Sequence, residues 1–350
     1  MQSVFLLNEY YVFAKFILHI RFTFRKYMNE DKTNIFTEFL KNIFSVTDAD
    51  YSHKLIRILG IRFRILKSNN KKRIKINYKQ YKDITQIPKA EGFLRDYQIS
   101  LLVILKEFDR ICALNNIRYW LSGGTLLGAK RHKGFIPWDD DVDVDMMRED
   151  YERFPSVFNA CTKYADLYCE LWRDKNSKAT CILKIKHRKI KQISIDIFPH
   201  DFYFTAVRGK DKKLLNKKLK KLRKKLSYSF FRIKDTEKLK EKIKDLTQNV
   251  INQKIEVDER ICPSIHWGLD FPHKWNNWVY DYEQIFPLQK IEFEGYLFSC
   301  PQNTDFMLKN IYGDYMQFPK SICPHHTDEE AFTSEEKQEL YKLKNAENLS

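Results

Sequence analysis

The chain has 350 residues, of which 43% are hydrophobic and 15% aromatic, so it can bury the core of one or two domains and is not intrinsically disordered. Its formal net charge of +16 predicts contact with an anion: a nucleic acid, a phospholipid surface, a phosphorylated glycan or a nucleotide. The seven cysteines are scattered and lack a Cys-x-x-Cys spacing, which argues against a disulfide framework or a zinc knuckle and indicates reduced thiols in a cytoplasmic protein.

The first 28 residues are dense in aromatic and aliphatic side chains but do not predict a transmembrane span. Asn8, Glu9 and Lys15 interrupt the run before about twenty apolar residues accumulate, and no signal-peptide cleavage site follows. Basic residues beside phenylalanines favour equally a helix on a lipid surface and a helix packed on the main domain.

Residues 29–90 are basic and weakly patterned. Within them, residues 55–66 predict a hairpin around Gly60, and the Ile87-Pro88 step predicts a linker over residues 84–91. We therefore expect three parts: a basic and aromatic appendage over residues 1–90, a main domain over residues 91–330, and a polar tail over residues 331–350.

The main domain opens with a predicted amphipathic helix over residues 98–114, because apolar residues recur there at three- and four-residue spacing. A short apolar strand over residues 117–121 then runs into a glycine turn and a helix start. The turn residues are Ser122, Gly123, Gly124 and Thr125. Glycines allow close approach to an anion, and backbone N–H groups at a helix start favour phosphate oxygens.

Residues 141–146 alternate acidic and apolar side chains, which predicts a strand with Asp141, Asp143 and Asp145 on one face. Three neighbouring carboxylates repel one another unless a cation neutralises them, and carboxylate oxygens suit Mg²⁺. A solvated loop would not carry the alternating valines. An EF-hand loop starting at Asp139 would need glycine and glutamate where Val144 and Asp150 stand.

The run SGGTLLG at residues 122–128, followed by RHKGFIPWDDDVD at residues 131–143, resembles the signature of the LicD/fukutin family. The run IDIFP at residues 195–199 and segments between residues 286 and 315 resemble it too, so that the likeness covers residues 93–326. The resemblance implies an α+β, nucleotidyltransferase-like fold with a mixed β-sheet flanked by helices. It also implies transfer of a phosphorylated alcohol from a CDP-linked donor to a glycan.

Further elements follow the acidic strand. We expect a helix over residues 148–160 despite Pro155, strands over residues 180–186 and 192–198, a hairpin around Gly295 and a helix over residues 304–312. A lysine-rich helical insertion over residues 207–254 suits either a solvated face or a dedicated anionic contact. The motif Cys323-Pro324-His325-His326 is interpreted as a polar loop rather than a metal site, and the polar tail beyond Phe332 is expected to fray.

The family resemblance implies that a third acid from a neighbouring strand completes the site, and Asp196 is the candidate; a salt bridge to a basic residue is its alternative. Asp141, Asp143 and Asp196 are thus the predicted catalytic and metal-binding residues, for Mg²⁺ with Mn²⁺ as the substitute. The predicted donor-phosphate contacts are Ser122, Gly123, Gly124, Thr125, Arg131, His132 and Lys133. For the last three, simple surface charge is the alternative.

We therefore expect a Mg²⁺-dependent transferase that moves phosphocholine from CDP-choline onto a sugar of a bacterial surface glycan (lipopolysaccharide, capsule or teichoic acid) and releases CMP. The alternatives are ribitol- or glycerol-phosphate transfer, and nucleotidyl transfer to nucleic acid, although no RNA- or DNA-binding motif is present and no nucleic acid partner is expected. Six tryptophans are candidates for a choline-binding cage. The expected partners are a CDP-alcohol, a glycan or glycolipid acceptor and an anionic membrane surface, reached peripherally from the cytoplasm.

Overall fold

The computed structural model describes residues 44–50, 53–58, 61–66, 81–173, 181–204, 263–267, 279–319 and 328–346, with isolated positions between 238 and 245. The chain divides into two compact units, residues 1–70 and 71–350. The predicted boundaries at residues 90 and 330 stay predictions. The N-terminal segment of residues 1–28, nearly all of the predicted lysine-rich insertion over residues 207–254 and the Cys323–His326 motif lie outside the described residues.

The first unit contains a three-stranded antiparallel sheet of β1 (Phe44–Asp50), β2 (His53–Ile58) and β3 (Ile61–Leu66). Residue 58 pairs with residue 61, so β2 and β3 form the predicted hairpin around Gly60. Local alternation of basic and apolar residues was sufficient to predict it.

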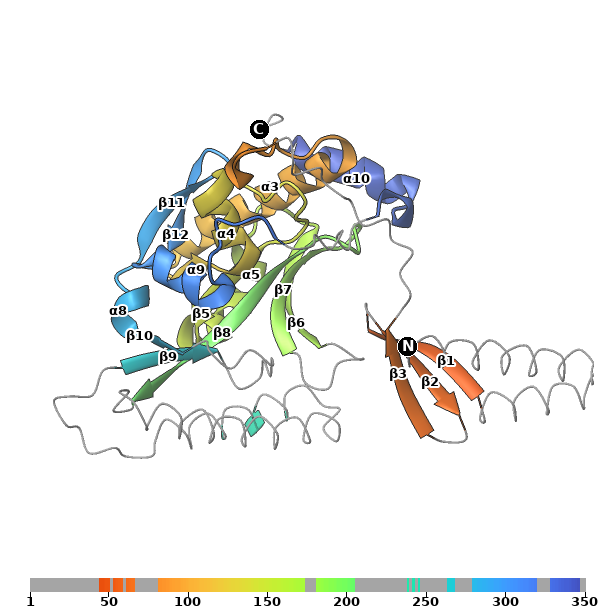
Figure 1. Ribbon diagram of the computed structural model, residues 1–350, viewed down its shortest axis with the longest axis horizontal. Helices are drawn as coiled ribbons and strands as arrows, with labels where there is room; N and C mark the ends of the chain where they lie inside the picture. The colour runs from red at the N-terminus through yellow and green to blue at the C-terminus, as the bar shows by residue number, and fades with distance from the viewer. Residues whose placement is uncertain are drawn as a thin grey trace, which may run out of the picture. The chain divides into compact units, whose positions relative to one another are not determined.

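The second unit is built on a seven-stranded mixed sheet (Figure 1). Its continuous order is β10 (Val279–Asp281), β9 (Pro263–Trp267), β8 (Ser194–Phe204), β5 (Asp143–Met147) and β4 (Tyr119–Leu121), and β7 (Cys181–His187) joins β8 to β6 (Leu167–Arg173). Only the β5–β8 pair is parallel among these described strands. The mixed sheet with flanking helices confirms the predicted α+β, nucleotidyltransferase-like class.

Three helices pack on this sheet: α3 (Gly92–Leu114), α4 (Gly123–His132) and α5 (Arg148–Cys161). The predicted apolar face of α3 is buried. The centre of the Phe108 ring lies 4.7 Å from that of Tyr119 of β4, in an edge-on arrangement, and 5.2 Å from that of Phe154 of α5. Burial of one such phenylalanine contributes about 1.5–3 kcal/mol, so Phe108 is a principal tie between the helices and the sheet. Helix α5 continues through Pro155, as predicted.

The C-terminal part adds α8 (Tyr282–Ile285), the hairpin of β11 (Gln289–Phe293) and β12 (Tyr296–Cys300), and α9 (Thr304–Tyr312). Both the hairpin around Gly295 and the helix match the predictions. No helix within the described ranges has the length and apolar character needed to cross a membrane.

Two expectations about the ends of the main domain are wrong. The tail does not fray beyond Phe332, because η3 (Glu329–Ala331) is followed by α10 (Ser334–Lys344), which lies along α3 with Leu340 and Leu343 buried (Figure 1). The segment predicted as a linker contains η2 (Ile84–Gln86), whose Ile84 is fully buried. In both places a few apolar side chains inside a polar stretch anchor the backbone.

Candidate active site

Two predicted acids meet across the parallel pair of strands. In the register of β5 and β8, Asp143 lies directly opposite Asp196, and paired residues of a sheet share a face. The backbone N–H of Asp196 also donates to the carbonyl of Val142 at 2.9 Å. The strand begins at Asp143, so Asp141 lies in the preceding loop and not within the strand, which corrects the predicted extent.

The glycine turn lies directly against the acids. A Cβ atom on Gly123 would stand 2.6 Å from Oδ2 of Asp143, and one on Gly124 would stand 2.6 Å from Oδ2 of Asp139. Gly123 also has a φ of +51°, a conformation that glycine adopts without strain. The two glycines therefore let the start of α4 approach two carboxylates more closely than any side chain would allow.

This approach makes Gly124→Ala an informative change. Alanine has a higher helix propensity than glycine, so α4 should not be weakened, while the new methyl group displaces the Asp139 carboxylate. We expect transfer activity to fall by about 10- to 100-fold, as for other changes in groups that orient an active site, at an unchanged melting temperature. Activity equal to that of the wild type would show that the position of Asp139 does not matter.

The acids form a concentrated negative cluster, the acid cluster, of Asp139, Asp141, Asp143 and Asp196. Burial raises the pKa of Asp143 well above its ordinary value, and the charges of Asp141, Asp196 and Asp139 raise it further. Burial likewise raises the pKa of Asp139, helped by Asp141 and Asp140 and opposed by Arg131. The neighbouring carboxylates thus make Asp143 and Asp139 harder to ionise, and a cation would relieve the repulsion.

Asp196 already has a cation beside it. The ammonium of Lys184, its partner on β7, lies 2.7 Å and 2.9 Å from the two carboxylate oxygens and 4.8 Å from the centre of the Trp172 ring. The salt bridge considered as the alternative for Asp196 is therefore present, and it sits within the acid cluster. Sequence reasoning missed Lys184 because nothing in one strand shows which residue will pair with it.

The chemistry of the acid cluster fits a hard divalent cation, since all four groups are carboxylates and their neighbouring charges raise the pKa values of Asp139 and Asp143. Among the described residues, however, no three His, Cys, Asp or Glu side chains are arranged as a set that could hold a metal ion. A cation that bound Asp196 would have to displace the ammonium of Lys184.

The predicted phosphate contacts separate into side chains and backbone. The hydroxyl of Ser122 is buried and donates to Oδ2 of Asp145 at 2.7 Å, and that of Thr125 accepts from the N–H of Asp143 at 2.8 Å. Both side chains therefore fix β5. The first N–H groups of α4 have no partner within the helix and begin beside the acid cluster, where they can bind an anion.

The basic residues at the end of α4 point to different neighbours. The guanidinium of Arg131 is buried, donates to the carbonyl of Tyr315 at 2.9 Å and lowers the pKa of Asp139. A ring nitrogen of His132 lies 3.2 Å from the carbonyl of Ile84; burial, with the charge of Arg131, lowers the pKa of His132 to about 4. Lys133 is exposed and pairs with Glu292 of β11 at 3.4 Å. Of these three predicted phosphate contacts, Arg131 lies near the acid cluster. His132 instead contacts Ile84, and Lys133 pairs with Glu292.

Two residues at the acid cluster, Asp139 and Tyr312, were not predicted from the sequence to be site residues. Asp139 follows Trp138 in the acidic run but precedes the alternating strand pattern, so periodicity gave no signal for it. Tyr312, at the end of α9, is also close: although 43% of the residue is exposed, desolvation of its hydroxyl group raises its pKa, and so do the charges of Asp143, Asp139 and Asp141. The signal for Tyr312 was the late family-like segment in which it stands.

Comparison with known proteins identifies the relatives of this site. Residues 116–213 match the family model described as LicD/FKTN/FKRP, nucleotidyltransferase domain. The chain is 30% identical over 262 residues to the lipopolysaccharide cholinephosphotransferase LicD of Haemophilus influenzae, a match that covers 67% of this chain and 97% of that protein. It is also 62% identical over 34 residues to the ribitol 5-phosphate transferase FKRP of Mus musculus, covering 10% of this chain and 7% of that protein.

An uncharacterised protein of Rickettsia typhi is 34% identical over 116 residues, 30% of this chain and 36% of that protein. The Haemophilus match carries the assignment, because it covers 97% of the relative and 67% of this chain. This protein therefore belongs to the LicD/fukutin family of nucleotidyltransferase-fold enzymes that transfer substituted phosphate groups.

Proposed function

We propose that the protein transfers phosphocholine from CDP-choline to a sugar of a bacterial surface glycan, with Mg²⁺ as cofactor and release of CMP. The observation that carries the proposal is the opposition of Asp143 and Asp196 beside the glycine turn of α4. The relationship to the lipopolysaccharide cholinephosphotransferase supports phosphocholine as the transferred group.

In the proposed mechanism Asp141 and Asp143 would hold the cation, which would neutralise charge on the diphosphate; Asp196 would join them only if the ammonium of Lys184 moved away. The N–H groups at the start of α4 bind phosphate oxygens and orient the donor. The acceptor hydroxyl forms a bond to the alcohol-bearing phosphorus, and the bond from that phosphorus to the bridging oxygen breaks, so CMP leaves with the oxygen. The hydroxyl proton passes to the carboxylate of Asp196, which acts as the general base.

One alternative has support of its own. The 34-residue identity to a ribitol 5-phosphate transferase favours a ribitol phosphate donor. Both reactions need the same acids, so only the group attached to the second phosphate distinguishes them.

A donor panel tests the proposal. The intact protein is incubated with Mg²⁺, a deacylated lipopolysaccharide acceptor and CDP-choline, CDP-ribitol or CDP-glycerol, while CMP and the modified glycan are measured. Acceptor-dependent CMP release with CDP-choline supports the proposal, and release with CDP-ribitol alone supports the alternative. If none of the donors is transferred to any acceptor, the proposed function is wrong.

Trp172 is expected to discriminate between these donors. Trp120 is fully buried, whereas Trp172 is partly exposed, lies beside the acid cluster and already carries an ammonium over its ring. A cation–π contact contributes about 0.5–2 kcal/mol, so Trp172→Ala should raise the KM for CDP-choline by about 2- to 30-fold relative to CDP-ribitol. Trp172→Phe should lose less, and equal effects on both donors would contradict this role.

We also propose that the reaction takes place at the cytoplasmic face of a membrane. The support is the net charge of +16, because each Lys or Arg near an anionic bilayer contributes about 1 kcal/mol. Sedimentation with anionic and neutral liposomes at low salt tests this proposal. If the same fraction of the protein sediments with both kinds of liposome, the membrane location is wrong.

A further inference from the structure

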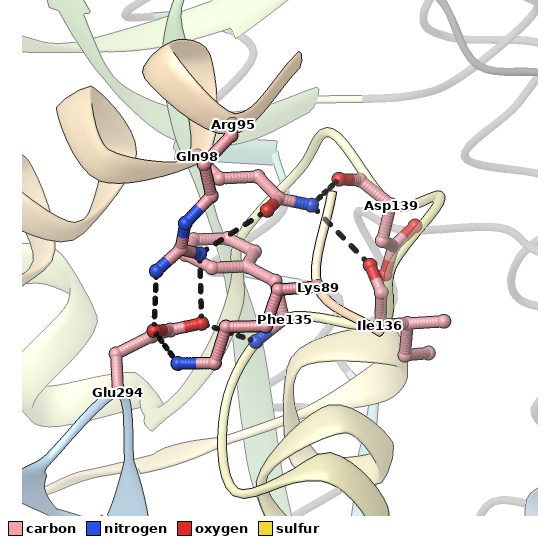
Figure 2. Close-up of polar contacts among 7 residues, drawn as sticks. All are labelled: Lys89, Arg95, Gln98, Phe135, Ile136, Asp139 and Glu294. Carbon is pink, nitrogen blue, oxygen red and sulfur yellow. Dashed lines mark hydrogen bonds and ion pairs between the residues drawn. The ribbon is translucent and has the colours of Figure 1, made fainter. Parts of the chain in front are cut away.

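An ionic cluster around the buried carboxylate of Glu294 lies outside the residues that the proposed mechanism uses. Glu294, at the turn between β11 and β12, has only 4% of its side chain exposed. Its carboxylate is 2.7 Å from the ammonium of Lys89 and 2.8 Å from the guanidinium of Arg95 on α3 (Figure 2). Burial alone would raise the pKa of Glu294, but the hydrogen bonds from Arg95 and Lys89 outweigh it and lower the pKa to about 2. The carboxylate is therefore ionised at neutral pH.

Glu294 also forms hydrogen bonds with the loop that leads into the acid cluster. The N–H of Phe135 donates to the Glu294 carboxylate at 3.1 Å, and the N–H of Glu294 donates to the carbonyl of Lys133 at 2.8 Å. Gly134 lies between them, and a Cβ atom there would stand 2.4 Å from the carboxylate. The backbone and the side chain of Glu294 thus both connect the end of α4 to the β11–β12 hairpin.

Further hydrogen bonds, made by Gln98, connect this ionic cluster to Asp139. Arg95 donates to the amide oxygen of Gln98 at 3.3 Å, and the amide nitrogen of Gln98, which is fully buried, donates to the carbonyls of Ile136 at 3.3 Å and Asp139 at 2.8 Å (Figure 2). The carboxylate of that same Asp139 rests against Gly124. Side chains from α3 and the hairpin therefore fix both ends of the loop before the acids.

We infer that Glu294 is a positioning residue, which acts through Arg95, Gln98 and the loop of residues 133–139 to set the carboxylates of the acid cluster for cation binding. Glu294 is not a metal ligand, because its carboxylate is occupied by Lys89, Arg95 and the N–H of Phe135. The cation itself rests on the proposed function, so the experiment below separates the two.

The test is Glu294→Gln, which keeps the shape of the side chain and removes the charge that Lys89 and Arg95 balance. Outer residues that orient metal ligands typically change metal affinity or activity by about 10- to 100-fold. We expect Mn²⁺, measured by electron paramagnetic resonance without donor, to bind Glu294→Gln about 10- to 100-fold more weakly than the wild type. The Mg²⁺ concentration for half-maximal transfer should rise in parallel, with a smaller change in the KM for the donor.

Three variants keep the result interpretable. Glu292→Gln changes an exposed acid on the same hairpin and should bind Mn²⁺ as the wild type does. Phe158→Leu disturbs a buried residue of α5 and controls for lost stability, so it should lower the melting temperature without weakening Mn²⁺ binding. Gln98→Met removes the hydrogen bond to Asp139 while leaving the ionic cluster in place, and it should weaken Mn²⁺ binding as Glu294→Gln does.

Mn²⁺ binding that is equal in Glu294→Gln and Phe158→Leu, or absent from the wild type, would overturn the inference. The proposed function fails independently. If the wild type transfers no CDP-alcohol but Glu294→Gln still weakens Mn²⁺ binding, the positioning role stands and the donor assignment falls. If the wild type transfers phosphocholine but Glu294→Gln binds Mn²⁺ unchanged, the donor assignment stands and the positioning role falls.

Discussion

Asp143→Asn is expected to abolish transfer while leaving the fold intact, and to give the largest effect of any single change. It removes a charged oxygen from the centre of the acid cluster, directly opposite Asp196. Loss of one group that stabilises transition-state charge typically costs about 100- to 1,000-fold in turnover, and a ligand to the cation should cost at least as much. Asp141→Asn should act in the same direction. The rate of CMP release at saturating donor and Mg²⁺ measures both.

A stability measurement separates this outcome from misfolding. Burial and neighbouring negative charges raise the pKa of Asp143, so its ionised form is unfavourable in the metal-free fold. A neutral asparagine relieves that repulsion, and the melting temperature of the metal-free variant should equal or exceed that of the wild type. Mg²⁺ should raise the melting temperature of the wild type but not of Asp143→Asn. The exposed Glu152→Gln on α5 serves as the control, and full activity in Asp143→Asn would refute the assignment.

The parts of the site that the sequence predicted are those encoded by short-range patterns. A glycine turn before a helix and a period-two alternation of acids and valines are both local, so they located α4 and β5. The start of β5 was misjudged because Asp141 continues the alternation without joining the strand. The family resemblance, rather than periodicity, supplied Asp196.

What the sequence did not predict depends on contacts between distant segments. Arg95 and Glu294 are 199 positions apart, and neither stands in a pattern that pairs it with the other. The pairing of Lys184 with Asp196 likewise needs the register of β7 on β8. Helix α10 is a different case, because its capping box of Thr333 and Glu336 is a local signal that was present and was overlooked in a polar tail.

The role of Asp196 can be decided by removing its partner as well. Asp196→Asn should cause a severe loss of turnover with donor binding partly retained, because the acid cluster loses one of its members. Lys184→Met should leave Asp196 without its cation and lower stability. Since the side chains of Lys184 and Asp196 are 17% and 23% exposed, we expect a loss of about 1–2 kcal/mol, below the about 3–5 kcal/mol of a fully buried pair.

The double variant Lys184→Met/Asp196→Asn distinguishes the two interpretations of this salt bridge. Neutralising both partners leaves no unbalanced charge, so stability should return toward the wild-type value. If Asp196 serves transfer, activity stays lost in the double variant although stability is regained. If the pair is only structural, turnover should follow stability through all three variants, with Asp196→Asn nearly as active as the wild type. Chemical denaturation measures stability and initial rates measure turnover on the same preparations. Activity that stays lost when stability is regained assigns Asp196 to catalysis, and activity that follows stability assigns it to the fold.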